Sequence, residues 1–138
     1  MILLDTNVIS EIMAPRPDER VTRWLDRLDR GSVWTTAINA YEIRSGLLAM
    51  APGKRRTALE LKFDQALNVS LEGRILNFDA ESASRAAELS ADRRSRGRPV
   101  DVRDTMIAGI VLANHATLAT RNVRHFDDIA KSVVNPWE

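Results

Sequence analysis

The chain has 138 residues, of which 44% are hydrophobic, and its formal net charge is +1. This composition predicts one globular domain over residues 1–138 and excludes a disordered chain. The absence of cysteine excludes disulfides and thiolate metal sites, and the presence of only two histidines argues against a multi-histidine zinc site. No secretory segment precedes Asp5, and no apolar run approaches the length of a membrane span, so we expect a soluble, cytoplasmic protein.

The N-terminal residues predict a buried strand that ends in an acid. Residues 2–4 are apolar without alternation, which is typical of a strand buried on both faces, and Asp5 follows directly. Thr6 is expected to cap a short helix, which Pro15 and Pro17 end. In parallel sheets, ligands bind outside the carboxyl ends of the strands, which is where this acid falls.

The rest of the chain predicts strands alternating with helices. This pattern favours an α/β fold with a central parallel sheet of four to five strands, covered on both faces. The helices at 37–50 and 54–68 are apolar on more than one face, so we expect them to bury surface against a dimer partner. Strands are expected at 32–35, 75–78, 116–120 and 132–134, and helices at 18–30, 37–50, 54–68, 80–96, 102–114 and 126–130.

Three acids are predicted to meet at the carboxyl edge of this sheet. Asp5 follows the first strand, Glu42 lies in the helix after the second strand, and Asp104 lies in the first turn of an apolar helix. Neighbouring carboxylates raise one another's pKa, and a divalent cation removes that conflict. Carboxylates favour hard ions such as Mg²⁺ or Mn²⁺, which polarise phosphoryl oxygens and activate bound water.

Each acid also has a simpler interpretation. Asp5 could cap its helix, and Glu42 could be a surface glutamate paired with an arginine such as Arg44. Asp104 could complete a cap with Asp101, because an acid in a first turn gains about 0.3–1 kcal/mol from the helix dipole. The joint arrangement of the three acids favours a metal site more than any one of them does.

The segment 92–103 is rich in arginine and forms a candidate phosphate-binding patch. The alternative is a solvated helix end, since the preceding helix is expected to stop near Gly97 and Pro99. Arginines that position phosphates carry little sequence information. The arginines that are candidates for a contact with a partner are Arg44, Arg93, Arg94, Arg96, Arg98, Arg103 and Arg121.

Five short motifs occur in order along the chain, at residues 4–11, 41–46, 101–108, 119–122 and 135–137. Together they resemble the PIN-domain family, in particular the VapC-type toxins and their FitB-like relatives. The resemblance implies a PIN-like three-layer α/β/α sandwich and a Mg²⁺- or Mn²⁺-dependent endoribonuclease that cuts tRNA or ribosomal RNA. It also implies a homodimer and a VapB-like antitoxin, through which alone the larger complex binds operator DNA. The candidate arginines are then expected to contact RNA or the antitoxin.

The chain departs from this family at Asn122, where many relatives have a fourth acid. An asparagine can ligate a metal through its carbonyl or hold a metal-bound water, but it adds no negative charge. We therefore expect one tightly bound ion, with any second ion arriving with the substrate. The resemblance assigns metal binding to Asp5, Glu42 and Asp104, and support of the site to the hydroxyls of Thr6 and Thr120.

Three functions are consistent with these residues. The first is an endoribonuclease toxin in which Asp5, Glu42 and Asp104 hold the ion and Asn122 assists. The second is a catalytically silent PIN-like partner that binds an antitoxin and operator DNA, which the missing fourth acid favours. The third is a phosphoaspartate enzyme, but those enzymes usually carry a second acid close to the nucleophile, and Asn7 stands two positions beyond Asp5. The sequence favours the nuclease.

Overall fold

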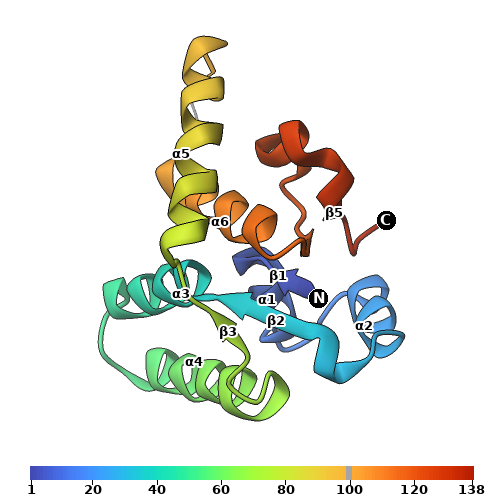
Figure 1. Ribbon diagram of the computed structural model, residues 1–138. Helices are drawn as coiled ribbons and strands as arrows, with labels where there is room; N and C mark the ends of the chain where they lie inside the picture. The colour runs from blue at the N-terminus through green and yellow to red at the C-terminus, as the bar shows by residue number, and fades with distance from the viewer. Residues whose placement is uncertain (99–100) are drawn as a thin grey trace.

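The computed structural model describes residues 1–98 and 101–138, so Pro99, expected at a helix end, lies outside the described residues. Five parallel strands within these ranges form one sheet with the order β3-β2-β1-β4-β5. The N-terminal strand β1 is therefore central and pairs with both β2 and β4 (Figure 1). The strands are β1 (Ile2–Leu4), β2 (Val33–Thr36), β3 (Ile75–Leu76), β4 (Thr117–Ala119) and β5 (Val133–Val134).

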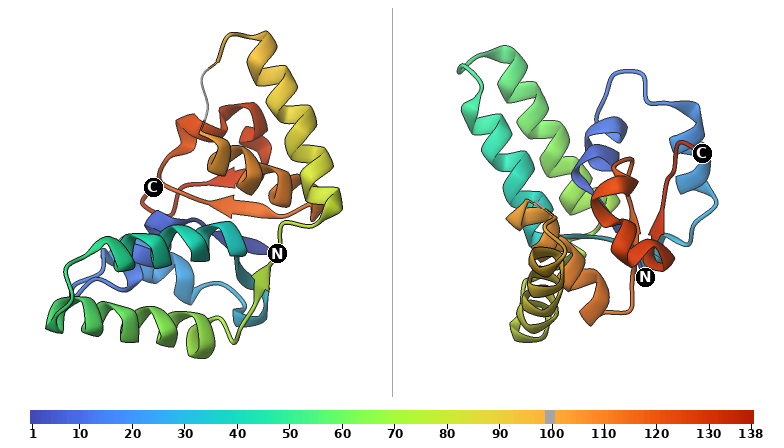
Figure 2. Two further views of the ribbon diagram at one scale, coloured as in Figure 1. Left: turned by 90° about the vertical axis from the view of Figure 1, so that its left-hand side faces the viewer. Right: turned by 90° about the horizontal axis from the view of Figure 1, so that it is seen from above.

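Helices cover both faces of this sheet, which confirms the expected three-layer α/β/α arrangement (Figure 2). Helices α1 to α4 contribute to the core on one face, and α5, α6 and the 3-10 segment η3 cover the other. In the described ranges no helix is both long and apolar enough to cross a bilayer. The helical elements are α1 (Thr6–Ile12), α2 (Glu19–Asp26), η1 (Arg30–Ser32), α3 (Ala37–Ala49), α4 (Lys54–Gln65), the π-turn η2 (Ala66–Ser70), α5 (Ala80–Ser95), α6 (Val102–Ala113) and η3 (Val123–Ser132).

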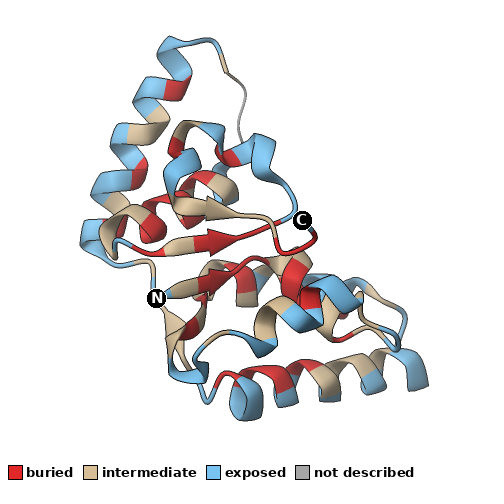
Figure 3. Cartoon of the chain, turned by 90° about the vertical axis from the view of Figure 1, so that its right-hand side faces the viewer, coloured by how far each residue is buried: buried red, intermediate tan, exposed pale blue. Residues whose placement is uncertain are grey.

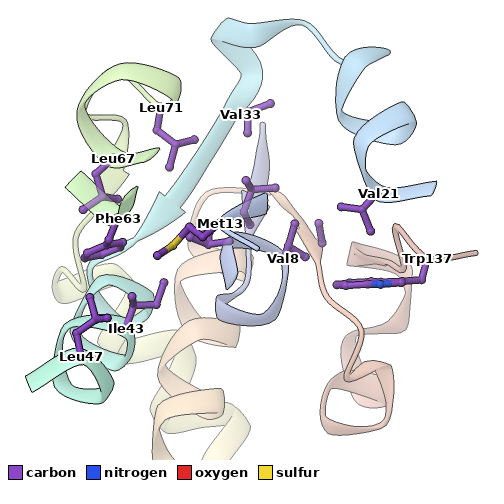
Figure 4. Close-up of a cluster of buried hydrophobic side chains, with 13 residues drawn as sticks. Val8, Met13, Val21, Val33, Ile43, Leu47, Phe63, Leu67, Leu71 and Trp137 are labelled. Carbon is purple, nitrogen blue, oxygen red and sulfur yellow. The ribbon is translucent and has the colours of Figure 1, made fainter. Parts of the chain in front are cut away.

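The central strand is buried on both faces, as its uninterrupted apolar residues predict. Leu3 belongs to the core beneath α6, whereas Leu4 belongs to the opposite core, because successive side chains of a strand alternate in direction. Figure 4 shows this second core, in which Phe63 of α4, Val8 of α1 and Trp137 near the C-terminus belong to one cluster on a single face of the sheet. The strands lie between two layers of partly exposed helices (Figure 3); β1, β2 and β4 are mostly buried, and the edge strands β3 and β5 are partly buried.

Helices α3 and α4 lie side by side and extend away from the sheet (Figure 2). Their inner face carries Leu47 and Phe63, which are buried, and their outer positions include Leu48 and Leu61, which are more than half exposed. This distribution matches the expected apolar surface on more than one face of the pair. Helix α4 ends earlier than expected because the chain passes into the π-turn η2.

Helix α6 lies in the interior, as expected of a helix that is apolar all round. Ile107 and Val111 are fully buried, and α6 packs closely along α5. Gly109 lies at the point of closest approach. A Cβ there would stand 2.5 Å from the carbonyl oxygen of Ser82 and 2.7 Å from the Cβ of Ala86. The absence of a side chain at this position allows the two helices to approach.

We predict that Gly109→Ala destabilises the protein by about 1–3 kcal/mol, because overpacking forces the two helices apart. Gly46→Ala is the matched control, since a Cβ at Gly46 of α3 would meet nothing within 4 Å. That replacement should stabilise α3 by up to about 1 kcal/mol. Urea unfolding followed by circular dichroism measures both changes, and equal effects at the two glycines would contradict the packing argument.

Candidate active site

The polar residues at the carboxyl ends of β1, β2 and β4 come together because these strands are adjacent and parallel. Asp5 follows β1, and Thr120 follows β4. Thr36 ends β2 and caps α3 by accepting a hydrogen bond from the Asn39 backbone N–H at 3.1 Å. The edge of the sheet therefore brings together side chains that are more than 30 residues apart in sequence.

Asp5 is the most constrained of the three acids, with only 5% of its surface exposed. One carboxylate oxygen accepts hydrogen bonds from the Thr6 backbone N–H and the Asn39 side-chain amide, both at 2.8 Å. The other oxygen accepts from the Thr120 hydroxyl at 2.7 Å and from the Asn7 amide at 3.3 Å. These four donors satisfy a buried carboxylate and hold it in one orientation.

The expectation that Thr6 caps the first helix is wrong. Asp5 itself is the N-cap, because its extended backbone, with φ −72° and ψ 164°, directs its carboxylate to the N–H of Thr6. The Thr6 hydroxyl is thereby available to the site. It accepts from the Asn39 amide at 3.0 Å and donates to Glu42 at 3.2 Å.

Glu42 lies one turn beyond Asn39 on α3 and is partly buried. Burial raises the pKa of its carboxyl, and the negative charges of Asp5 and Asp104 raise it further, against the opposing Thr6 hydrogen bond and the Arg103 charge. The Arg103 guanidinium is 3.8 Å from the Glu42 carboxylate, so it does not pair closely. The alternative partner Arg44 instead pairs with Asp64 at 3.1 Å.

Asp104 lies in the first turn of α6, and Asp101 is the N-cap of that helix. Asp104 is therefore not needed for capping. Burial raises the pKa of its carboxyl, the charge of Asp5 adds to this, and His125 opposes it. The Nδ1 atom of His125 is 3.0 Å from the Asp104 carboxylate. The negative charge of Asp5 is thus close enough to raise the pKa of both Glu42 and Asp104.

Thr120 connects several parts of this edge through a single hydroxyl. It donates to Asp5 and accepts from the Asn7 amide at 3.2 Å and from the Asn122 backbone N–H at 3.0 Å. The side chain of Asn122 is exposed and, within residues 1–98 and 101–138, it forms no hydrogen bond to the three acids. Its contribution to the site is through its backbone.

Sequence reasoning missed three members of this cluster: Asn7, Asn39 and His125. Asn39 is fully buried, and the Thr36 hydroxyl donates to its carbonyl oxygen at 2.6 Å, which turns its amide group toward Asp5. A helical offset of three from Asn39 to Glu42 places both on one face and is a usable signal. His125 has no such signal, because only the tertiary structure brings it to Asp104.

The donor set of this site fits a hard divalent cation. It consists of three carboxylates with carbonyl and hydroxyl oxygens nearby, and burial together with mutual repulsion raises the pKa of two of the acids. In the described part of the chain, no three acidic or histidine side chains are already gathered tightly enough to hold one ion. Mg²⁺ needs only one or two protein carboxylates, because it retains several waters.

The expected arginines do not form one continuous patch. Arg103 lies nearest the acids, and Arg121 stacks over the Trp137 ring at 5.0 Å. Arg98 pairs with Asp127 and also donates to the backbone of η3 at Arg124. Arg44 of α3 lies over Phe63 and pairs with Asp64, both on α4. Arg94 donates to Ser90 and Arg96 pairs with Asp92, each within one turn of α5.

The expectation that Arg93 contacts RNA or an antitoxin is wrong, because only 2% of its surface is exposed. Its guanidinium forms two hydrogen bonds with Asp128, at 2.7 and 2.8 Å, and faces the interior between α5 and η3. A helical position within an arginine-rich run gives no indication of which arginine turns inward. Here the buried carboxylate of Asp128 decides it.

Comparison with known proteins shows which family this chain belongs to. A model described as the PIN domain matches residues 2–132. The VapC ribonuclease Y4jK of Sinorhizobium fredii is 36% identical over 138 residues, which cover 100% of this chain and 99% of that protein. Toxin FitB of Neisseria gonorrhoeae is 37% identical over 137 residues, or 99% of each chain. The chain belongs to the PIN-domain family.

The likeness extends to the three-dimensional structure. The solved structure of FitAB bound to an IR36 DNA fragment matches with a TM-score of 0.88 at 37% identity, and the match covers 100% of this chain and 96% of that one. The resemblance to VapC-type and FitB-like proteins is therefore confirmed in both sequence and fold.

We predict that Asp128→Asn destabilises the protein by about 3–5 kcal/mol near neutral pH, because it leaves the buried Arg93 charge unpaired. Asp92→Asn is the matched control. It removes the acid from an exposed pair with Arg96, which contributes about 0–1 kcal/mol. Chemical unfolding of both variants measures the difference, and similar losses would contradict the burial argument.

The same pair predicts how stability depends on pH. Hydrogen bonds from Arg93 hold the pKa of Asp128 below its ordinary value of 3.8. As the pH falls, the unfolded chain therefore takes up this proton first, and the stabilisation that is complete above about pH 5 is lost in acid. The stability difference between wild type and Asp128→Asn should shrink as the pH is lowered through that range. A constant difference would contradict the prediction.

Proposed function

We propose that this protein is a metal-dependent endoribonuclease and the toxin of a VapBC-like pair. The observation that carries the proposal is the convergence of Asp5, Glu42 and Asp104 at the carboxyl edge of the sheet, where two of them have raised pKa values. Full-length similarity to a named VapC ribonuclease supports the activity. The arrangement needs neither a cysteine nor a histidine nucleophile.

In this proposal Asp5, Glu42 and Asp104 hold Mg²⁺ or Mn²⁺. When bound, such an ion polarises a phosphoryl oxygen and lowers the pKa of a coordinated water. Asp5 keeps a fixed orientation through its four hydrogen bonds, and the Thr6 hydroxyl holds Glu42 beside it. Asn122, at the exposed rim, is available to the substrate side of the site.

Arg103 is the arginine best placed to contact an RNA phosphate at this site. Its side chain is half exposed, and its contact with Glu42 is long, at 3.8 Å. Its pair with Asp101, at 3.3 Å, is also on the surface. Neither contact removes it from solvent, so a phosphate can compete for the guanidinium. The RNA class implied by the family resemblance is tRNA or ribosomal RNA.

The proposed partners follow from the family relationship. FitB is named a toxin, and FitAB was solved bound to DNA. We therefore infer that this chain binds a VapB-like antitoxin, that operator DNA is bound through that antitoxin, and that the toxin forms a homodimer. The exposed Leu48 and Leu61 on α3 and α4 are apolar surface available for such contacts.

The decisive experiment compares wild type with Asp5→Asn. The variant should fold and lose RNA cleavage by more than about 100-fold, because a metal ligand matters at least as much as its supporting residues. Asp26→Asn, the same change at an exposed position of α2, should retain full activity. Sequencing of RNA ends after induced expression measures cleavage and identifies the target.

Two results would overturn this proposal. A folded Asp5→Asn protein that cuts RNA at the wild-type rate would show that the acids are not the site. A wild-type protein that neither binds Mn²⁺ in calorimetry nor cuts RNA would favour the catalytically silent partner, which would still bind an antitoxin.

We also predict that Thr120→Val lowers activity by about 10- to 100-fold, because it removes a hydroxyl that orients Asp5 without changing the size of the side chain. Thr22→Val, at an exposed position of α2, is the control and should not change the rate. Single-turnover cleavage of one RNA substrate measures both. Equal rates for Thr120→Val and wild type would show that this hydroxyl does not support the site.

A further inference from the structure

The buried guanidinium of Arg93 binds more than its salt-bridge partner. Besides Asp128, it donates to the Thr105 hydroxyl at 3.0 Å and to the backbone carbonyl of His125 at 3.2 Å. Arg93 comes from α5, Thr105 from α6, and the other two acceptors from η3. One side chain therefore joins three elements that are separate in sequence.

The two additional acceptors are immediate neighbours of the proposed site. Thr105 directly follows Asp104, and its hydroxyl also donates to the carbonyl of Asp101 at 3.2 Å, within the first turn of α6. The backbone that Arg93 holds at His125 carries the imidazole that contacts Asp104 at 3.0 Å. Arg93 thus hydrogen-bonds to the residue next to Asp104 and to the backbone of His125, which are the two segments that form the Asp104–His125 contact.

This anchoring matters because η3 is irregular. Phe126 and Ile129 have non-helical backbone angles, so the segment lacks the continuous hydrogen-bond ladder of an α-helix. Its position depends on the burial of these two side chains and on side-chain contacts such as the one from Arg93. If Arg93 only stabilised the fold through an ion pair, Asp128 would be a sufficient partner. Two nitrogen atoms of the same guanidinium also donate to the segments that carry Asp104 and His125.

We propose that Arg93 is a positioning residue, which sets the distance between the first turn of α6 and η3 and so holds Asp104 and His125 in register for the divalent cation. The inference rests on the proposed metal-dependent function. It assigns a role in the site to an arginine that does not touch the substrate. It also explains why one arginine of the basic segment is buried, since a guanidinium in this place has a hydrogen-bond acceptor on each of the two elements.

The test replaces the buried ion pair by apolar side chains, Arg93→Met with Asp128→Leu, in the full chain. Such replacements often preserve stability, so the fold is expected to survive. Mn²⁺ affinity measured by calorimetry should fall by about 10- to 100-fold, as for other supporting residues of metal sites. The matched control is Arg85→Met with Glu81→Leu, an exposed pair on the same helix, and it should bind Mn²⁺ as wild type does.

A second measurement separates positioning from stability. The ¹⁵N resonances of the His125 imidazole, recorded without metal and assigned with His125→Gln, report whether Nδ1 is hydrogen-bonded. They should change in the Arg93/Asp128 variant and in Thr105→Val, which removes one acceptor while keeping the residue shape. If the paired variant does not fold, Thr105→Val decides the question with the same two measurements.

The outcomes distinguish this inference from the proposed function. If Asp5→Asn weakens Mn²⁺ binding but the folded Arg93/Asp128 variant binds Mn²⁺ normally and leaves the His125 resonances unchanged, the positioning role is wrong and the metal site stands. If Asp5→Asn leaves Mn²⁺ binding unchanged, the proposed metal site is wrong, and the cation-positioning role fails with it.

Discussion

A buried carboxylate at the end of the central strand organises the functional end of this protein. Asp5 is almost fully enclosed, and an ionised carboxylate in such a place is costly unless its oxygens are hydrogen-bonded. The donors come from α1, from α3 and from the residue after β4. Their positions require β1 to lie between β2 and β4. The acid site therefore depends on the order of the strands.

The three acids are held in different ways, and the difference suits a site that receives a cation and a phosphate. Asp5 accepts four hydrogen bonds and has little freedom. Glu42 accepts one hydrogen bond from the Thr6 hydroxyl, at 3.2 Å, and Asp104 lies 3.0 Å from the His125 imidazole. Burial and mutual repulsion raise the pKa of these two looser acids. In the proposed metal site, one rigid carboxylate would thus lie beside two carboxylates that have fewer hydrogen bonds to hold them.

The basic residues separate into two groups according to where the fold places them. Arg103 remains half exposed beside the acids, whereas Arg93 is enclosed between α5, α6 and η3. The close approach of α5 and α6 at Gly109 brings Arg93 near the first turn of α6, because only a residue without a side chain fits there. The packing of α5 against α6 on one face of the sheet therefore affects the position of the residues next to Asp104, at the edge where the acids lie.

The sequence by itself determined the alternation of strands and helices, the burial of β1 on both faces and the interior position of α6, and it singled out Asp5, Glu42 and Asp104 as candidate site residues. These are local properties, set by apolar periodicity, capping residues and the common carboxyl edge of parallel strands. Tertiary structure alone decided that Asn39 and His125 join the site and that Arg93 turns inward. Each of these depends on which distant side chain fills the neighbouring space, and hydrogen-bond partners 21 to 115 residues apart leave no periodic trace in a single chain.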